Sequence, residues 1–202
     1  MTADQVTRLE RALRETSGAS SDFDLNPDVV LPAGRKLRDA GVLVAFQEGL
    51  NGLDLILTKR SSRLKHHPGQ IAFPGGKVDE DDTDVTAAAL REAHEEIGLP
   101  QAHVRVLGTL PSHETVTGFN VTPVLALVTA AFETIPEPGE VDEVFTVPFD
   151  HVTDPARFVV QSRRWRGQRR IRRARGRAAL QGRRRAGPAR QLHGKGVVAG
   201  LR

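Results

Sequence analysis

Three glutamates in one short segment are the residues of this chain best suited to carry chemistry. Glu92, Glu95 and Glu96 lie within residues 85–97, whose pattern predicts a helix that is stopped by Gly98. On a helix, Glu92 is a neighbour of both other glutamates, so three carboxylates crowd one face and repel one another. A hard divalent ion, Mg²⁺ or Mn²⁺, would relieve that repulsion and could also bind the phosphate groups of a substrate. A solvated acidic face is the alternative interpretation.

Two glycines and a basic stretch precede the predicted helix. Gly75 and Gly76 would allow the backbone to turn sharply or to approach a phosphate closely. Residues 59–67 are rich in cations, among them Arg60 and Lys65, which an anionic substrate would need. An ordinary turn and a solvated basic loop are the respective alternatives.

The surrounding elements predict a layered domain that mixes helices and strands. The spacing of apolar residues predicts a helix over residues 3–15, and β-type runs at 42–46 and 53–58 on either side of a turn predict a hairpin. Further strands are expected at residues 104–107, 121–128 and 144–147. Mixed strands around one long helix are typical of an α/β or α+β architecture.

The composition places the chain among globular proteins and excludes several classes. Of its 202 residues, 39% are hydrophobic and 27% are charged, which excludes collagen, coiled coil and full disorder. The absence of cysteine excludes disulfides and thiolate metal sites. There is neither an apolar run of about 18 residues nor a secretory signal pattern at the start, so we expect a cytoplasmic protein that does not interact with a membrane.

Charge divides the chain into an acidic body and a basic tail. Residues 155–202 hold 16 of the 29 Lys and Arg and none of the 25 Asp and Glu. We therefore divide the chain into a helix and loop at 1–30, a central domain at 31–160 and an arginine-rich tail at 161–202. Three interpretations of the tail stay open: a disordered arm that binds nucleic acid, a helical extension that folds back on the body, or the out-of-frame translation of a GC-rich gene. The acidic body argues against nucleic-acid binding by the whole chain.

The predicted helix belongs to a longer motif with fixed spacing. Residues 91–99 read Arg-Glu-Ala-His-Glu-Glu-Ile-Gly-Leu, and they follow Gly76 after a spacer. This pattern resembles the Nudix box, in which a glycine and a spacer precede Arg-Glu-apolar-x-Glu-Glu-x-Gly-apolar. Two positions differ: Asp82 replaces the usual early glutamate, one residue farther from Arg91 than is common, and Ala93 replaces a larger apolar residue. The longer spacing is similar to the variant box of the coenzyme A pyrophosphatase branch of the Nudix family.

A second stretch, residues 56–76, is similar to the signature of the same branch. It reads Ile-Leu-Thr-Lys-Arg-Ser-Ser-Arg-Leu-Lys-His-His-Pro-Gly-Gln-Ile-Ala-Phe-Pro-Gly-Gly, and it ends, as that signature does, on Phe-Pro-Gly-Gly. Lys65 stands where arginine is commoner. The resemblance as a whole covers about residues 30–155.

The resemblance implies a fold and an activity. The implied fold is a Nudix-type α/β/α sandwich with a mixed β-sheet. The implied activity is the divalent-metal-dependent hydrolysis of the diphosphate bond of coenzyme A to 3′,5′-ADP and 4′-phosphopantetheine, with coenzyme A thioesters left open as further substrates. Two alternatives remain: a Nudix hydrolase of ADP-ribose or another nucleoside diphosphate derivative, and a non-catalytic protein that binds nucleotide or, through its tail, nucleic acid. The expected partner is the small-molecule substrate, and a homodimer is left open.

The same resemblance implies roles for individual residues. Mg²⁺ or Mn²⁺ is expected on the three box glutamates, Glu92, Glu95 and Glu96. Arg91 is expected to orient one of these glutamates rather than to touch substrate. The general base is expected to be a box glutamate, Glu95 or Glu96, or an acid of a later loop, Glu140 or Glu143. The expected substrate-binding residues are Arg60, Lys65, Phe73, Gly75 and Gly76.

Overall fold

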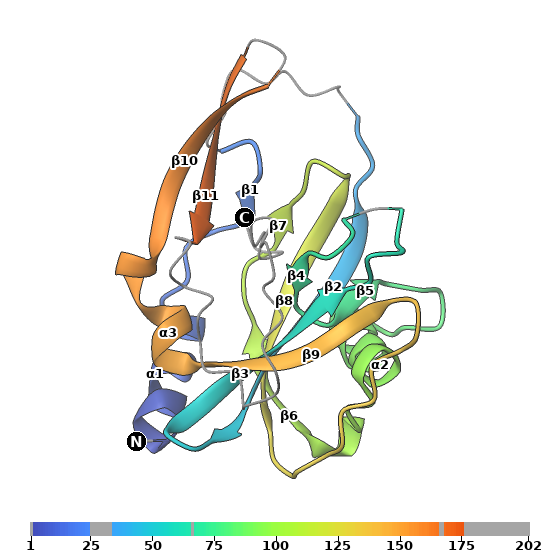
Figure 1. Cartoon of the computed structure of the whole chain (residues 1–202), viewed down its shortest axis with the longest axis vertical. Coiled ribbons are helices and arrows are strands. Elements are labelled where there is room, and N and C mark those ends of the chain that lie inside the picture. Colours follow the sequence, from blue (N-terminus) through green and yellow to red (C-terminus); the bar gives the residue numbers. More distant parts are fainter. Residues whose placement is uncertain (1, 25–33, 66, 166–167, 176–202) are drawn as a thin grey trace, which may run out of the picture.

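The computed structural model describes residues 2–24, 34–65, 67–165 and 168–175 (Figure 1). Its α-helices are α1 (Thr2–Arg14), α2 (Val85–Ile97) and α3 (Phe149–Thr153), and short 3₁₀ turns lie at Gln101–His103 and Pro155–Arg157. Its strands are β1 (Ser20–Ser21), β2 (Arg38–Gly49), β3 (Gly52–Arg60), β4 (Ile71–Ala72), β5 (Gly75–Lys77), β6 (Val104–Thr109), β7 (His113–Glu114), β8 (Phe119–Val128), β9 (Val141–Pro148), β10 (Phe158–Trp165) and β11 (Gln168–Arg175). None of the helices described is long and apolar enough to cross a membrane.

Strands β1 to β9 form one mixed sheet with β2 at its centre. β2 runs parallel to β8, from the pair Arg38–Phe119 onward, and pairs antiparallel with β3 next to their hairpin turn. β3 pairs in turn with β9, and β6 and β7 both pair with β8. β5 pairs with β2 opposite Ala40 and Val42, which brings Gly75 and its neighbours to the middle of the sheet. The prediction of an α/β fold with a mixed sheet is confirmed.

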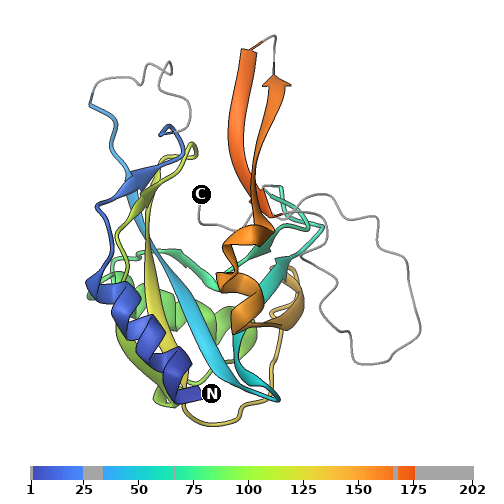
Figure 2. The same ribbon diagram turned by 90° about the vertical axis from the view of Figure 1, so that its left-hand side faces the viewer.

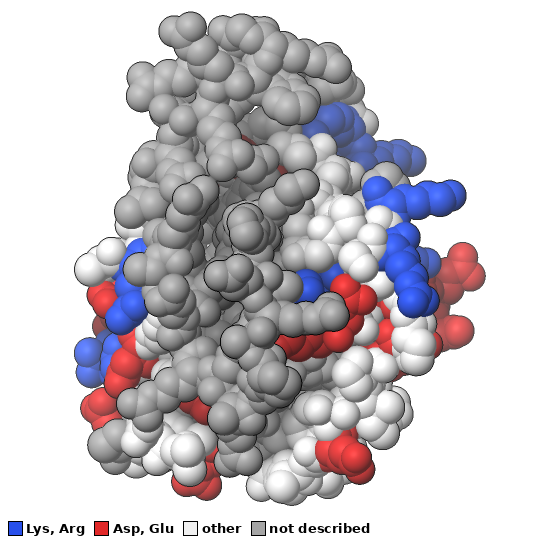
Figure 3. All heavy atoms as spheres, viewed as in Figure 1, with Lys and Arg blue, Asp and Glu red and all other residues white. Residues whose placement is uncertain are grey.

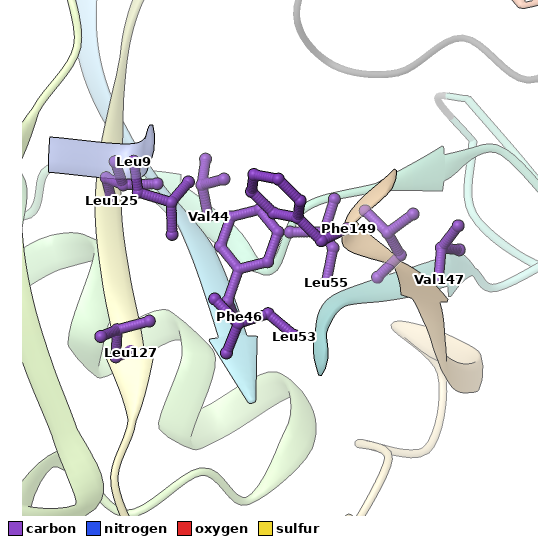
Figure 4. Close-up of a cluster of buried hydrophobic side chains, with 10 residues drawn as sticks. Leu9, Val44, Phe46, Leu53, Leu55, Leu125, Leu127, Val147 and Phe149 are labelled. Carbon is purple, nitrogen blue, oxygen red and sulfur yellow. The ribbon is translucent and has the colours of Figure 1, made fainter. Parts of the chain in front are cut away.

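The side chains of β2 alternate between two apolar layers, one on each face of the sheet. Leu43 and Ala45 belong to the cluster that contains the buried residues of α2. Val44 and Phe46 belong to the opposite cluster, which includes residues of α1 and α3 (Figure 4). There the rings of Phe46 and Phe149 lie 5.5 Å apart and tilted by 58°. Helices therefore cover both faces of the sheet, as the predicted α/β/α sandwich requires.

Helix α1 packs onto the sheet beside the central domain (Figure 2). Leu9 is buried in the apolar cluster of that face, and Val6 and Leu13 pack against it. The buried Gln5 accepts a hydrogen bond from the backbone N–H of Leu53, with 2.7 Å between the nitrogen and Oε1. The first helix is thus part of the same layered unit as residues 34–158.

The basic end of the chain begins with a β-hairpin. β10 pairs antiparallel with β11 over eight residues, and the two form a separate two-stranded sheet. Residues 161–165 and 168–175 of the predicted tail therefore lie in strands, and the nucleic-acid-binding arm and the folded-back extension stay predictions. Residues 176–202 lie outside the described residues, and the out-of-frame interpretation stays a prediction.

Candidate functional site

Helix α2 has well-defined ends that match its predicted bounds. The Asp84 carboxylate accepts hydrogen bonds from the N–H groups of Thr86 and Ala87, both at 2.8 Å, and so caps the N-terminus. At the other end, Gly98 has a φ of 71°, a conformation that glycine adopts readily, and its N–H is bonded to the carbonyl of His94 at 2.9 Å. These caps fix both ends of the helix that carries the box glutamates.

Helix α2 lies close to the sheet because a glycine faces it from β2. A Cβ placed on Gly41 would lie 2.0 Å from the carbonyl oxygen of Val85 and 3.1 Å from the Cβ of Ala89. Ala89 and Ala93 are fully buried in the layer between helix and sheet. This close approach turns the acidic face of α2 toward the glycines of β5.

Glu96 is the buried carboxylate at the centre of the site. Its side chain is 5% exposed, and its Oε2 accepts a hydrogen bond from the N–H of Gly75 at 3.1 Å. The guanidinium Nη1 of Arg60 lies 3.9 Å from its Oε1. Burial, together with the charges of Glu92 and Glu140, raises the pKa of Glu96 to about 7, against the opposing effects of Gly75 and Arg60.

The raised pKa of Glu96 predicts a pH dependence of the stability of the metal-free protein. The folded state binds the Glu96 proton more tightly than the unfolded state does, so this proton stabilises the fold. Its contribution to the free energy of unfolding is fully present below about pH 4.5 and is lost as the pH rises through about 7. The shift from 4.5 to about 7 corresponds to about 3 kcal/mol. We expect Glu96→Gln to remove this component, so that the difference in free energy of unfolding between wild type and variant changes between pH 5 and 8.

Denaturant unfolding in a buffer that contains a chelator measures this difference. Subtracting the variant from the wild type cancels the titration of the other carboxylates, which the two proteins share. A difference that stays constant from pH 5 to 8 would contradict the assignment of the raised pKa to Glu96. Excess Mg²⁺ is expected to flatten the dependence, because a bound cation favours the ionised carboxylate.

Glu92 lies against the second glycine of β5. A Cβ placed on Gly76 would lie 2.3 Å from Glu92 Oε1, so a side chain at position 76 would displace this carboxylate. Burial raises the pKa of Glu92, with contributions from Glu95 and Glu140, while Arg91 opposes the shift. The glycine pair predicted to turn the chain thus also makes room for the box glutamates: Gly75 binds Glu96, and Gly76 accommodates Glu92.

Arg91 joins the box helix to the segment before it. Its Nε and Nη2 donate to the two carboxylate oxygens of Asp82, at 3.0 and 2.8 Å, in a bidentate pair. Its Nη1 donates to Glu92 at 3.2 Å and to Glu95 at 2.9 Å. The hydrogen bond from Arg91 holds the pKa of Asp82 below its usual value. Arg91 therefore contacts two box glutamates while anchored on Asp82, which is the arrangement expected of an orienting residue.

The two acids predicted from the later loop are placed differently. Glu140, in the connection before β9, contributes to the raised pKa of both Glu92 and Glu96. In β9, Val144 packs with the α2 layer and Phe145 with the opposite layer. Alternation then puts Glu143 on the face of Phe145, away from α2. The structure brings Glu140 to the box glutamates and does not bring Glu143 to them.

The structure places the remaining predicted substrate-binding residues in different surroundings. Arg60 lies at Glu96, as described above, whereas Lys65 is exposed in the loop 61–70. Phe73 packs against the apolar cluster on the α1 and α3 face, so its ring is part of that apolar layer. The space-filling view shows Lys and Arg side chains gathered along the right-hand margin of the molecule, next to Asp and Glu (Figure 3). A cationic surface therefore adjoins an acidic one.

The box carboxylates fit a divalent cation in their chemistry. Glu92 and Glu96 are acidic oxygen donors whose pKa values are raised by burial, and the negative charge of Glu140 contributes to both shifts. Glu95 differs from them, since its side chain is 55% exposed and paired with Arg91. Among the described residues, no three Asp, Glu or His side chains form a group arranged to hold one metal ion. Glu92 and Glu96 are the residues that would hold a cation here, and Glu95 would have to leave Arg91 to join them.

Comparison with known proteins identifies relatives of this chain. The model of the NUDIX domain family matches residues 35–166. Proteins named "Uncharacterized Nudix hydrolase NudL" from Enterobacter sp. (strain 638) and Pectobacterium atrosepticum are each 45% identical over 104 residues, which is 52% of this chain and 54% of theirs. The chain therefore spans about half the length of the curated relatives it matches.

Two solved structures align with part of this chain. The Nudix hydrolase RenU from M. smegmatis aligns with a TM-score of 0.49 and 26% identity, over 59% of this chain and 75% of that one. The NUDIX domain of Shewanella oneidensis NrtR, solved with ADP ribose, aligns with a TM-score of 0.47 and 19% identity, over 62% and 82% of the two chains.

Proposed function

Because this chain belongs to the Nudix family, we propose that it is a divalent-metal-dependent hydrolase of the diphosphate bond of coenzyme A. The products would be 3′,5′-ADP and 4′-phosphopantetheine. One observation carries the proposal: Glu96 is bonded to Gly75 and lies 3.9 Å from Arg60. Both of these partners belong to the stretch 56–76 that is similar to the coenzyme A branch. The stretch and the box therefore build one site.

Hydrolysis of the diphosphate needs a cation, a general base and a group that binds the anionic substrate. Nudix hydrolases generally use Mg²⁺ or Mn²⁺. Such an ion, when bound, acts as a Lewis acid on the diphosphate, and Glu92 and Glu96 would hold the ion. Arg60, half-buried beside Glu96, would bind a phosphate oxygen of the substrate. Glu140 is an exposed carboxylate whose charge acts on Glu92 and Glu96, so we assign it the role of accepting the proton of the attacking water.

The residues around the box hold these groups in place. Arg91 keeps Glu92 in position through the bidentate pair with Asp82, so that the carboxylate needs no reorganisation when substrate binds. Gly76 leaves the space that Glu92 occupies. Glu95, exposed and bonded to Arg91, would contribute to the metal site only after turning away from that guanidinium.

Product analysis tests the proposed function directly. The purified 202-residue chain is incubated with coenzyme A, and separately with ADP-ribose, in Mg²⁺ or Mn²⁺, and the products are separated by liquid chromatography. We expect 3′,5′-ADP and 4′-phosphopantetheine from coenzyme A, and no reaction when a chelator removes the metal. Cleavage of ADP-ribose alone would reassign the substrate class. Nucleotide binding without cleavage of either compound would contradict the enzyme and support the binding protein.

A further inference from the structure

The loop that carries the cations is tied at its base to the segment before β9. We call residues 61–70, which include Arg63 and Lys65, the basic loop. Its first residue, Ser61, is 1% exposed and donates its N–H to the carbonyl oxygen of Glu140 at 2.7 Å. The next residue, Ser62, donates its N–H to the carboxylate Oδ2 of Asp142 at 3.1 Å. Two successive backbone donors of the basic loop thus end on one short segment, 140–142.

These contacts fix the direction in which the chain leaves β3. The Ser61 hydroxyl accepts from the N–H of Arg63 at 3.3 Å, and the Ser61 carbonyl accepts from the N–H of Leu64 at 3.3 Å, which closes a tight turn. The loop returns to its starting point, since the Arg60 N–H is bonded to the carbonyl of Gln70 at 2.8 Å. Arg60 is therefore held by backbone contacts at the root of the basic loop, with its guanidinium at Glu96.

Asp142 owes its position to an irregularity in the pairing of β3 with β9. Arg60 pairs with Val141 and Lys59 with Glu143, so Asp142 is the extra residue of a β-bulge. A bulge re-aims the side chain of the extra residue. Here the side chain is aimed at the Ser61–Ser62 turn, and the Ser62 N–H is the main reason that the pKa of Asp142 is lowered.

The same segment continues to the box helix. The N–H of Glu140 is bonded to the carbonyl of Glu137 at 3.2 Å, and the N–H of Glu137 to the carbonyl of Glu96 at 2.9 Å. The connection 137–142 therefore touches the end of α2 on one side and the root of the basic loop on the other. If the connection 137–142 bound the basic loop differently, the distance between the cationic side chains of that loop and the box carboxylates would change.

We propose that Asp142 is a positioning residue for the substrate-binding loop. It does not touch substrate; it holds the first turn of the basic loop, which begins directly after Arg60, so that Arg60 stays beside Glu96 and can bind a diphosphate there. The proposal rests on the function proposed above, because it takes a polyanionic substrate as the ligand of this loop. It assigns to the bulge in β9 a role in affinity rather than in the chemical step.

Steady-state kinetics of two variants test this role. Asp142→Ala removes both carboxylate oxygens, whereas Asp142→Asn keeps one oxygen that can accept from Ser62. We expect KM for coenzyme A to rise about 10-fold in Asp142→Ala, as for a lost hydrogen bond, with kcat within about 3-fold of wild type. Asp142→Asn should recover most of the change. Glu133→Gln, which removes an exposed carboxylate from the loop before β9, is the control with unchanged KM.

Limited trypsin digestion gives a readout that does not depend on the substrate. Peptides cut after Arg63 and Lys65 are quantified by mass spectrometry at early times, so that cleavage elsewhere in the chain does not interfere. We expect faster cleavage in Asp142→Ala than in wild type or Glu133→Gln, because the loop opens locally more often.

Faster cleavage together with a raised KM supports the proposal. Unchanged cleavage, or faster cleavage with KM unchanged, overturns it, as does an equal rise of KM in Asp142→Asn. If the wild-type chain hydrolyses no coenzyme A, the proposed function fails. The cleavage rates then still decide whether Asp142 holds the loop.

Discussion

Glu96→Gln is expected to lower kcat for coenzyme A by about 10³-fold, the order found when a group essential to the transition state is removed. The amide keeps the shape of the side chain and an oxygen that can accept from the N–H of Gly75. It removes the negative charge that a divalent cation requires and that Arg60 faces at 3.9 Å. Because the fold keeps its contacts, the loss should fall on the chemical step. Single-turnover rates at saturating substrate and Mg²⁺ measure it.

The control for this variant comes from the same helix. Glu95→Gln also replaces a box glutamate by its amide, but the Glu95 side chain is 55% exposed and bonded to Arg91 rather than to the glycines. We expect its kcat to fall by about 10-fold to 100-fold, less than that of Glu96→Gln. Equal losses in the two variants would mean that the carboxylates act as one unit, and that Glu95 turns away from Arg91 when metal binds.

The local elements of the site could be predicted from the sequence because their signals are local. The helix over residues 85–97 has the predicted bounds, since Asp84 and Gly98 supply both caps within the segment itself. The hairpin of β2 and β3 was likewise predicted, because alternation and a turn with glycine occur close together. The box glutamates follow from the helix, since spacing alone puts Glu92 beside its neighbours.

The long-range features could not be predicted because they depend on pairings between distant strands. Nothing near Gly41 indicates that α2 will cross it, and nothing near β5 indicates that it will pair with β2. The clearest case is the choice between Glu140 and Glu143. The register of β9 against β3, with its bulge at Asp142, decides which of them faces α2, and that register forms between residues about 80 positions apart.

Arg91→Ala is expected to lower kcat/KM by about 10²-fold and to lower Tm, although Arg91 touches no reacting atom. The guanidinium holds Asp82 by two hydrogen bonds and contacts Glu92 and Glu95 through a third nitrogen. Its loss leaves the Asp82 carboxylate, 5% exposed, without its bidentate partner. Glu92 also loses the cation that opposes its raised pKa, so its pKa would rise further and its carboxylate would bind metal less tightly.

Arg91→Lys separates the charge of the guanidinium from its geometry. Lysine keeps a positive charge but cannot make the planar bidentate pair with Asp82 while also reaching two glutamates. We therefore expect most of the loss in kcat/KM to persist in Arg91→Lys, and higher Mg²⁺ to restore part of it by favouring the ionised Glu92. Arg105→Lys, a change at an exposed position of β6, should leave both Tm and kcat/KM at wild-type values. Full activity in Arg91→Lys would show that charge alone suffices and that the bidentate pair does not position the site.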